Sequence, residues 1–425
     1  MTPETVNPTP ARDPRRATAT ARAAGSLARH QRSMGDPRIR YPLWPPLPRG
    51  CPRTGSDLAD FPLEVDYAYE DTPADLFTGP ARPGLERWAP LLPPLDAPGL
   101  GEGGTPLLPL GDGVWIKDES QNPTWSHKDR LNRVTVSAAV HEGAPGVAVA
   151  SSGNHGSSAA AYAARAGLAC VVLASAGAPP AVAAFLQAYG AVVLPVPAER
   201  RWPLLNEVCD RLGYHPVSNL TRTHTGHPFG AEGYKTIAYE IHAELGVPAA
   251  VFVPTGYGEL LYGVWKGFRE LRQLGVTDTV PRVFGCEPAA GAPLGTALRT
   301  GVPAAVVPVG PTDAYAIDCA AGSHRAVRAV LDSGGAAVPV TDAELGRARD
   351  RLASRGIWAE LSAAAGLAGL ERWTSTGGGF DGPVVCVSTS SGFKDLRLGT
   401  APLEPVEPTW EAVSRALADR ARPAG

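Results

Sequence analysis

The chain has 425 residues, of which 44% are hydrophobic and 19% charged, and its net charge is −3 at pH 7. This length and composition predict a globular protein of roughly two or three domains with sizeable cores. The small net charge argues against a nucleic-acid partner or an anionic membrane surface, and no apolar run approaches the ~20 residues of a membrane helix.

Six cysteines are scattered along the chain without a CxxC pair. This pattern favours reduced thiols in a cytoplasmic protein over a disulfide framework. The N-terminus lacks the long apolar stretch of a secretory signal. Its richness in Arg, Ala and Thr resembles a transit peptide, but a compositional bias of the whole chain explains it better.

The first regular element is expected only near Gly104. Residues 1–40 are rich in Pro, Arg, Ala and Thr without a clear apolar period, which predicts a disordered or loosely docked arm. Residues 41–94 are Pro-rich with interspersed aromatics and are expected to wrap over the surface of the main body.

Beyond this point, short apolar segments alternate with longer Ala-rich ones. Strands are predicted at Val114–Glu119, Gly146–Ala150, Ala169–Ala174, Ala191–Val196, Ala249–Gly256, Pro281–Pro288 and Gly382–Thr389. Helices are predicted at Lys128–Gly143, His155–Gly167 and Pro179–Gly190, and from the turn after Gly256 through Leu274. Wholly apolar strands that alternate with helices predict an α/β fold of parallel sheets, each covered on both faces.

Ligands of such sheets bind at the carboxyl ends of strands, where turns lead into helix N-termini. Four such turns are unusually rich in Gly, Ser, Thr or Asn: Asn122–Asp129, Ser151–Gly156, Thr255–Glu259 and Ser388–Gly392.

The first turn, "NPTWSHKDR", places Lys128 at the start of a helix. The positive end of the helix dipole disfavours a cation there and lowers its pKa, which suits a lysine that forms a Schiff base and moves protons. A lone lysine in such a place is usually a solvated surface residue. The short polar side chains around this one shift the balance: Asn122, Thr124, Ser126 and His127.

Each of the other turns has a plain structural alternative. Ser151–Gly156 could bind a carboxylate at a helix N-terminus, or simply cap that helix. Gly256 and Gly258 could form a phosphate cradle, although GxG alone is weak and matches neither a P-loop nor GxGxxG. The hydroxyls of Ser388–Asp395 could donate to a ring nitrogen or only form a turn.

Taken in order, these motifs resemble the fold-type II family of pyridoxal-phosphate enzymes, which is tryptophan synthase β-like in fold, and within it the threonine synthases. The resemblance extends from about Gly103 to Asp395. Its motifs are Gly103–Leu110, Lys117–Arg130, Ala150–Gly167, Val253–Phe268, Ala359–Leu370 and Thr389–Asp395. It implies two α/β domains with pyridoxal 5'-phosphate between them, residues 95–134 with 221–425 forming the large one and residues 135–220 a small mobile one. It also implies a homodimer.

The resemblance further implies roles for individual residues. Lys128 would hold the cofactor as a Schiff base and later move the α-proton. Asn154 would hydrogen-bond the cofactor's 3'-oxygen, and Thr389 would face its pyridine nitrogen. The cofactor phosphate would be held by Gly256, Tyr257, Gly258, Glu259 and Leu260, and the substrate by Ser151, Ser152, Gly153, His155, Trp125, Thr225 and His227.

Several positions depart from the family pattern. Trp125 stands for Gly and should reshape the substrate pocket, while His127 stands for Phe and is expected to pack or to act as a second acid–base group. Tyr257 and Glu259 stand where dehydratase-like members have Gly. Because an acid beside a phosphate is unfavourable, the Glu259 side chain is expected to face outward.

The segment Thr223–Thr236 resembles the one that grips the substrate phosphate in threonine synthase. Thr225 keeps a hydroxyl, but His227 replaces Asn and Gly230 replaces Arg. Loss of that Arg removes a charge-assisted anion contact, which His227, His224 or Arg222 could restore. Residues 41–70 resemble a cysteine-bearing zinc segment that keeps only Cys51, so no metal site is predicted.

Three functions are weighed for an amino-acid substrate. The first is a threonine synthase-like lyase or synthase that works by α-proton abstraction and β-elimination or replacement. The second is a serine or threonine dehydratase-type ammonia-lyase, or a β-replacement enzyme of a specialised biosynthetic pathway, favoured by the lost Arg and by Trp125. The third is a non-catalytic member of the fold, against which the joint presence of Lys128, Asn154 and Thr389 argues.

Overall fold

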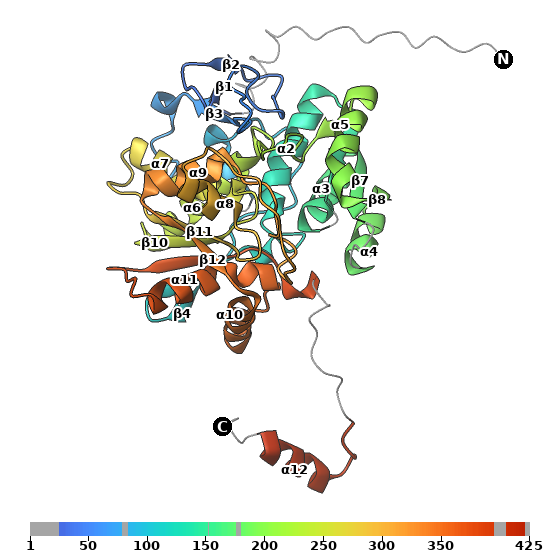
Figure 1. Ribbon diagram of the computed structural model, residues 1–425, viewed down its shortest axis with the longest axis vertical. Coiled ribbons are helices and arrows are strands. Elements are labelled where there is room, and N and C mark those ends of the chain that lie inside the picture. The colour runs from blue at the N-terminus through green and yellow to red at the C-terminus, as the bar shows by residue number, and fades with distance from the viewer. Residues whose placement is uncertain (1–24, 79–83, 152, 176–179, 395–404, 421–425) are drawn as a thin grey trace, which may run out of the picture.

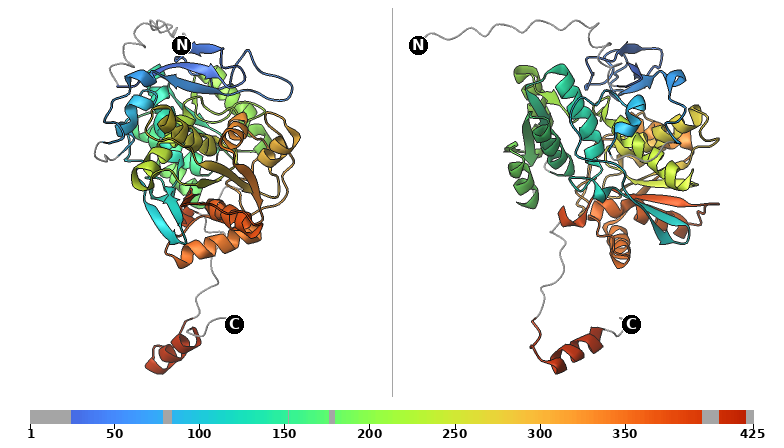
Figure 2. Two further views of the ribbon diagram at one scale, coloured as in Figure 1. Left: turned by 90° about the vertical axis from the view of Figure 1, so that its left-hand side faces the viewer. Right: turned by 180° about the vertical axis from the view of Figure 1, so that it is seen from behind.

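The computed structural model describes residues 25–78, 84–151, 153–175, 180–394 and 405–420. In these residues the chain forms three β-sheets, of six, four and three strands. The four-stranded sheet and its helices form a lobe of their own beside the six-stranded sheet, and helix α2 lies between the two (Figures 1 and 2). This arrangement confirms the predicted α/β fold class.

The six-stranded sheet has the order β12-β11-β10-β13-β5-β4. All neighbours are parallel except β4 and β5, so the sheet is mixed rather than wholly parallel as expected. Its strands are β4 (Leu107–Gly111), β5 (Val114–Asp118), β10 (Ala250–Pro254), β11 (Arg282–Pro288), β12 (Ala336–Val340) and β13 (Val384–Ser388).

Helices cover both faces of this sheet because its central strands are apolar on both sides. In β10, Val251 and Val253 pack into the core beneath helices α6, α7 and α9, while Phe252 packs into the core beneath α10 and α11. Side chains alternate in this way along any strand. The helices are α6 (Gly230–Leu245), α7 (Glu259–Gln273), α8 (Pro293–Thr300), α9 (His324–Ser333), α10 (Asp342–Ser354) and α11 (Ala365–Ser375).

The four-stranded sheet is wholly parallel, with the order β8-β7-β6-β9. Its elements are β6 (Gly146–Val149), β7 (Ala169–Ser175), β8 (Val192–Val196), β9 (His215–Pro216), α3 (Asn154–Arg165), α4 (Pro180–Ala188) and α5 (Arg201–Leu212). Helix α2 (Lys128–Glu142) contacts both α3 of this lobe and α6 of the other. The predicted domain boundary at Thr135 falls inside α2, and the mobility of the small domain stays a prediction.

A third, antiparallel sheet lies in the N-terminal part, with the order β2-β1-β3. Its strands are β1 (Ala28–Ser33), β2 (Arg40–Pro42) and β3 (Leu63–Tyr67). The prediction of a loose arm up to residue 40 is therefore wrong from Ala28 onward, and residues 1–24 lie outside the described part. Strand β1 escaped detection because polar contacts hold it: the buried Gln31 side chain donates to Pro42 O at 2.9 Å and accepts from Leu47 N at 2.9 Å.

Buried ion pairs fasten this sheet to the large domain. Lys266 Nζ on α7 donates to Val65 O of β3 at 2.8 Å and pairs with Glu232 on α6 at 2.6 Å. Glu64 of β3 pairs with Arg269 on α7 at 3.0 Å. Residues 41–94 thus contribute two paired strands to a compact structure rather than only wrapping over it.

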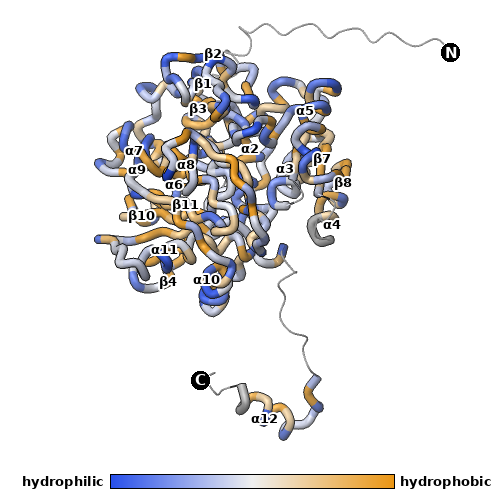
Figure 3. The backbone as a smooth tube through the Cα atoms, viewed as in Figure 1, coloured by the Kyte–Doolittle hydropathy of each residue, from blue (hydrophilic) through white to orange (hydrophobic). Residues whose placement is uncertain are grey.

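The remaining elements are short or peripheral. Helix α12 (Trp410–Arg420) lies apart from the body in Figure 1. Turns of 3₁₀-helix occupy Tyr69–Asp71, Glu86–Leu91, Glu119–Gln121, Ala198–Arg200, Leu361–Ala364 and Gly392–Lys394. Figure 3 shows hydrophobic residues concentrated along the central strands β10 and β11. Within the described ranges, no helix is long and apolar enough to cross a membrane.

Candidate active site

A cavity of about 430 Å³ opens at the carboxyl ends of β6, β10 and β13. Its lining comes from both lobes, since residues after β6 and residues after β10 both contribute to it. It brings together many of the predicted residues: Lys128, Ser151, Gly153, Asn154, His155, His227, Gly256, Tyr257, Gly258, Glu259, Leu260 and Thr389. Ser152 lies outside the described residues. Trp125 and Thr225 are described but are not part of this lining.

Lys128 is the first residue of α2 and lines the cavity. Burial lowers the pKa of its ammonium group, and the nearby Glu259 opposes that shift only in part. Lys128 Nζ donates to Tyr234 Oη of helix α6 at 3.1 Å. Sequence reasoning missed Tyr234, because nothing in the local pattern shows that a residue 106 positions away reaches the lysine.

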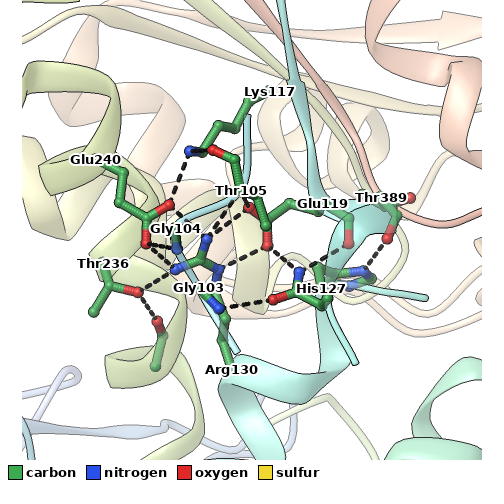
Figure 4. A network of polar contacts seen from close by, with 12 residues as sticks. Gly103, Gly104, Thr105, Lys117, Glu119, His127, Arg130, Thr236, Glu240 and Thr389 are labelled. Atoms are coloured by element: carbon green, nitrogen blue, oxygen red, sulfur yellow. Dashed lines mark hydrogen bonds and ion pairs between the residues drawn. The ribbon is translucent and has the colours of Figure 1, made fainter. Parts of the chain in front are cut away.

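Helix α2 begins at a rigid point because Arg130 is held from both sides (Figure 4). Its guanidinium pairs with Glu119 at 2.7 Å and with Glu240 at 2.6 Å, and all three side chains are buried. Just before Lys128, the backbone N–H of His127 donates to Thr389 O at 3.0 Å. Lys128 is therefore placed by a group of α6 and by the residues that directly follow β5 and β13, rather than by its own helix alone.

The turn between β10 and α7 forms a cradle of backbone N–H groups. Helix α7 starts at Glu259, and the N–H groups of its first turn have no partner within the helix. Gly258 has a φ of +87°, and a Cβ built there would lie 2.3 Å from Cβ of Ala326. Only glycine fits this position, and a helix N-terminus of this kind suits an anion such as a phosphate.

Asn154 and the end of β13 are joined by Glu360, another residue that sequence reasoning did not single out. Asn154 Nδ2 donates to Glu360 Oε2 at 2.9 Å, and Ser390 Oγ donates to the same oxygen at 2.7 Å. Glu360 stands in the segment Ala359–Leu370, which the sequence marked only as a motif. The contact ties the small lobe to the large one across the cavity.

The histidines of the lining are neutral. Burial lowers the pKa of His155 to about 3, and it lowers the pKa of His127, His224 and His227 well below 6.5. His227 has both ring nitrogens engaged within the protein: Nδ1 accepts from Phe229 N at 3.1 Å, and Nε2 lies 3.0 Å from Nε2 of His215. His227 is thus poorly suited to replace an arginine as an anion-binding group.

The expectation that the Glu259 side chain faces outward is wrong. This side chain is 8% exposed and lines the cavity, with Oε1 3.6 Å from Arg325 Nη1 and Oε2 3.8 Å from His224 Nε2. Burial raises the pKa of its carboxyl group, and Arg325 opposes the shift. The inward orientation is possible because residue 226 is glycine: a Cβ there would lie 2.0 Å from Glu259 Oε1.

Trp125 and Thr225 make their contacts outside the cavity lining. Trp125 has a φ of +61°, is 42% exposed, and packs edge-on against Phe185 of α4 with ring centroids 5.6 Å apart. Thr225 Oγ1 bonds to Thr221 Oγ1 at 2.8 Å and donates to Pro48 O at 3.1 Å. The first side chain links the two lobes outside the cavity, and the second holds a loop.

The chain is similar to a known family of enzymes and to curated proteins of that family. The family model described as "Pyridoxal-phosphate dependent enzyme" matches residues 99–390. Among curated proteins, the threonine synthase of Methanosarcina acetivorans is 33% identical over 78% of this chain and 86% of its own length. That of Mycobacterium tuberculosis is 33% identical over 69% of this chain and 82% of its own.

Solved structures share the fold at lower identity. Maize serine racemase superposes with a TM-score of 0.60 at 16% identity, covering 75% of this chain and 94% of that one. O-ureido-L-serine synthase superposes with a TM-score of 0.58 at 22% identity, covering 74% and 97%.

Proposed function

Because this chain belongs to the family of pyridoxal-phosphate-dependent enzymes and is threonine synthase-like in sequence, we propose that Lys128 holds the cofactor and moves the α-proton of an amino acid. One observation carries the assignment. The chain has five lysines, at 117, 128, 235, 266 and 394, and of these only Lys128 lines the cavity. Three of the others pair with buried carboxylates, and Lys394 donates to Thr124 O at 2.6 Å.

The residues present fit pyridoxal phosphate. Backbone N–H groups of Gly256, Tyr257, Gly258, Glu259 and Leu260 would hold its phosphate, because these residues line the cavity and the first N–H groups of α7 have no partner within the helix. Asn154 and Thr389 line the same cavity and would meet its ring substituents. When bound, the cofactor withdraws electrons from Cα of the attached amino acid and so makes the α-proton acidic.

The chain's own groups supply the proton transfer. A lysine whose pKa is lowered by burial is more often neutral near physiological pH, as a general base must be. Tyr234 Oη accepts a hydrogen bond from Lys128 Nζ and holds the amine in place. Departure of a substituent from the substrate's Cβ then gives elimination, and entry of a nucleophile there gives replacement.

The N-terminus of α3 would bind the substrate carboxylate. Ser151, Gly153 and His155 line the cavity there, and Gly153 N donates to Ser151 Oγ at 3.3 Å. His155 Nε2 is buried without a hydrogen-bond partner, which supports a ligand at this point because buried polar atoms are normally satisfied. As His155 is neutral, it would act as a hydrogen-bonding group rather than a charge.

The test is the visible absorbance of the purified protein. Lys128→Ala is expected to lose the band of the covalently held cofactor and all activity, because no other lysine reaches the cavity. Lys394→Met is the matched control: burial lowers the pKa of Lys394 to about 8, yet its loss should leave the band intact. A Lys128→Ala protein that keeps both band and activity would sink the assignment.

A second candidate differs in substrate rather than in cofactor. A threonine synthase acts on a phosphorylated amino acid, whereas a dehydratase or β-replacement enzyme acts on an unphosphorylated one. The buried Glu259 and the glycine at position 230 favour the second. Absorbance changes on adding serine, threonine, O-phosphoserine or O-phosphohomoserine singly would separate the two.

We place the enzyme in the cytoplasm as a homodimer. All six cysteines are free, which is the usual state in a reducing compartment. The dimer rests on the family resemblance alone, and light scattering of the purified protein would test it: a monomeric mass at micromolar concentration would contradict it.

A further inference from the structure

The lining of the cavity carries no excess of positive charge. Its cations are Lys128 and Arg201, and its carboxylates are Glu259 and Asp318. The four histidines are neutral because burial lowers their pKa. Burial also raises the pKa of Cys319 to about 12, so its thiol carries no charge. Bound cofactor would add a phosphate of nearly two negative charges, which makes the loaded site acidic.

The inward position of Glu259 is built into the chain. It depends on a glycine at 226, which itself has a φ of +61° and lies far from residue 259 in sequence. Its Oε1 is buried without a hydrogen-bond partner. The carboxylate thus occupies space left by Gly226, a glycine that itself lines the cavity, so the inward position of Glu259 is a feature of the site.

The cation nearest to Glu259 is committed elsewhere. Arg325 on α9 donates through Nη1 to Thr225 O and through Nη2 to Leu63 O, and its side chain is fully buried. It is not part of the cavity lining. Arg325 therefore offsets part of the charge of Glu259 but does not present its donors to a ligand.

Among the cavity-lining residues that the structure describes, Arg201 is the one cation that would remain for an anionic substrate group once Lys128 holds the cofactor. Arg201 is the first residue of helix α5. Its charge lowers the pKa of the Tyr257 hydroxyl, whereas the charge of Asp318 raises that pKa. Phosphate recognition in proteins usually uses several charge-assisted hydrogen bonds. A single arginine in a lining that also contains two carboxylates supplies less than that.

We propose that Glu259 is a specificity determinant that makes this cavity reject amino acids with a phosphorylated side chain. The inference rests on the proposed function and deepens it. The substrate class that fits is an amino acid with an uncharged leaving group at Cβ, such as a hydroxyl or an ester. Elimination from such a substrate breaks the Cα–H and Cβ–O bonds; the proton goes to Lys128 and the oxygen leaves with its electron pair.

The exclusion should weaken in acid. The groups that face Glu259 are Arg325 of α9, His224 of the preceding loop, Lys128 of α2 and Tyr234 of α6. None of them is an acid that titrates below neutrality. As the pH falls through the raised pKa of Glu259, its carboxyl group takes up a proton and the repulsion of a phosphate is lost.

The first experiment uses the wild-type holoenzyme and the matched pair L-serine and O-phospho-L-serine. Dissociation constants are read from the absorbance of the bound cofactor at pH 8. We expect serine to bind at least about tenfold more tightly, since a tenfold ratio needs only a modest repulsion. Equal or tighter binding of phosphoserine would overturn the inference and would point to Arg201 and the start of α5 as an anion site.

The second experiment compares Glu259→Gln with Glu207→Gln, a matched change at a partly exposed glutamate of α5. Glu259→Gln should shift the ratio of the two dissociation constants toward phosphoserine by about tenfold, whereas Glu207→Gln should leave it unchanged. The ligand's own phosphate titrates near pH 6, so the difference between wild type and Glu259→Gln across pH is the readout.

A wild-type protein that forms no cofactor band would remove the proposed function, and this inference with it. A normal band with unchanged discrimination in Glu259→Gln would overturn the inference alone. If Glu259→Gln does not fold, the wild-type ratio at pH 8 still decides, because preference for phosphoserine contradicts the proposal without any variant.

Discussion

At the scale of single residues, the hydroxyl of Tyr234 deserves a direct test. It is the group within hydrogen-bond distance of Lys128 Nζ, yet Tyr234 is fully buried and is not part of the cavity lining. It can therefore orient the lysine without touching the substrate.

Tyr234→Phe is expected to lower kcat about tenfold, the worth of one hydrogen bond, while KM changes little. The reason is that the general base loses its fixed position while the binding groups remain. Steady-state kinetics on the wild type and the variant would check this. A change confined to KM would mean that Tyr234 contributes to binding instead.

The sequence singled out cavity-lining residues where they stand in contiguous motifs. Lys128, Asn154 and the turn at 256–260 were found because each follows an apolar strand and opens a helix, which is a local pattern. The orientation of Glu259 was mispredicted because it depends on the missing side chain of Gly226, and Tyr234 was missed because its partner lies far along the chain. No local pattern encodes either relation.

At the scale of elements, helix α7 has a glycine with positive φ at each end. Gly258 precedes it with φ +87°, and Gly275 follows it with φ +70°. A Cβ at Gly258 would meet Ala326, whereas a Cβ at Gly275 would have nothing within 4 Å. Alanine would be strained by the positive φ at both positions, but it would collide with a neighbour only at Gly258.

Gly258→Ala is expected to weaken cofactor binding by at least about tenfold, because the cradle must shift to relieve the contact with Ala326. Gly275→Ala is the matched control and should cost stability, by roughly 1 kcal/mol, with cofactor affinity unchanged. Equilibrium titration of the apoprotein with pyridoxal phosphate measures the first effect, and denaturant unfolding measures the second. Equal loss of cofactor affinity in both variants would count against the cradle.

Elements were predicted from the sequence where strands are wholly apolar, as in β6, β10 and β13. Strand β1 was not, because amide contacts stabilise it and its sequence has no apolar period. Strand β3 does alternate, with Leu63, Val65 and Tyr67 buried, but it is only five residues long and was missed within the Pro-rich segment. Strand β4 was missed for a related reason: it lies at the edge of its sheet, carries Pro109 and pairs antiparallel with β5.

At the scale of the whole molecule, the N-terminal sheet and the large domain share one buried network of charges. Glu64 of β3 is 7% exposed, and its carboxylate pairs with Arg32 at 2.7 Å and accepts from Tyr262 Oη at 2.6 Å. Burial alone would raise its pKa, but Arg269, Lys266 and Arg32 together hold the pKa of Glu64 below its ordinary value.

Glu64→Gln is expected to reduce the free energy of unfolding by about 1–3 kcal/mol at pH 7, because it weakens the charge-assisted hydrogen bonds that Arg32 and Arg269 make to a buried acceptor. A carboxyl group whose pKa is lower in the folded state stabilises the fold fully above its unfolded pKa of about 4. The contribution begins to decline there and is lost as the pH falls through the lower folded-state pKa. The stability of the wild type should therefore fall toward that of the variant in acid. Urea unfolding at pH 7 and pH 4 measures both; a constant difference between the two proteins would refute the linkage.

His227 belongs to a chain of hydrogen bonds in which every donor and acceptor is fixed. Phe229 N–H donates to Nδ1, so the single ring proton of neutral His227 lies on Nε2 and points at His215, whose Nδ1 in turn lies 2.8 Å from Glu142 Oε2. The one hydrogen between the two imidazole rings is already in place on Nε2 of His227. A second proton, on Nε2 of His215, would put two hydrogens between these nitrogens, which lie 3.0 Å apart. The pair of His227 and His215 therefore cannot relay a proton away from the cavity, and a deuteron taken from the substrate's Cα is not expected to leave along it.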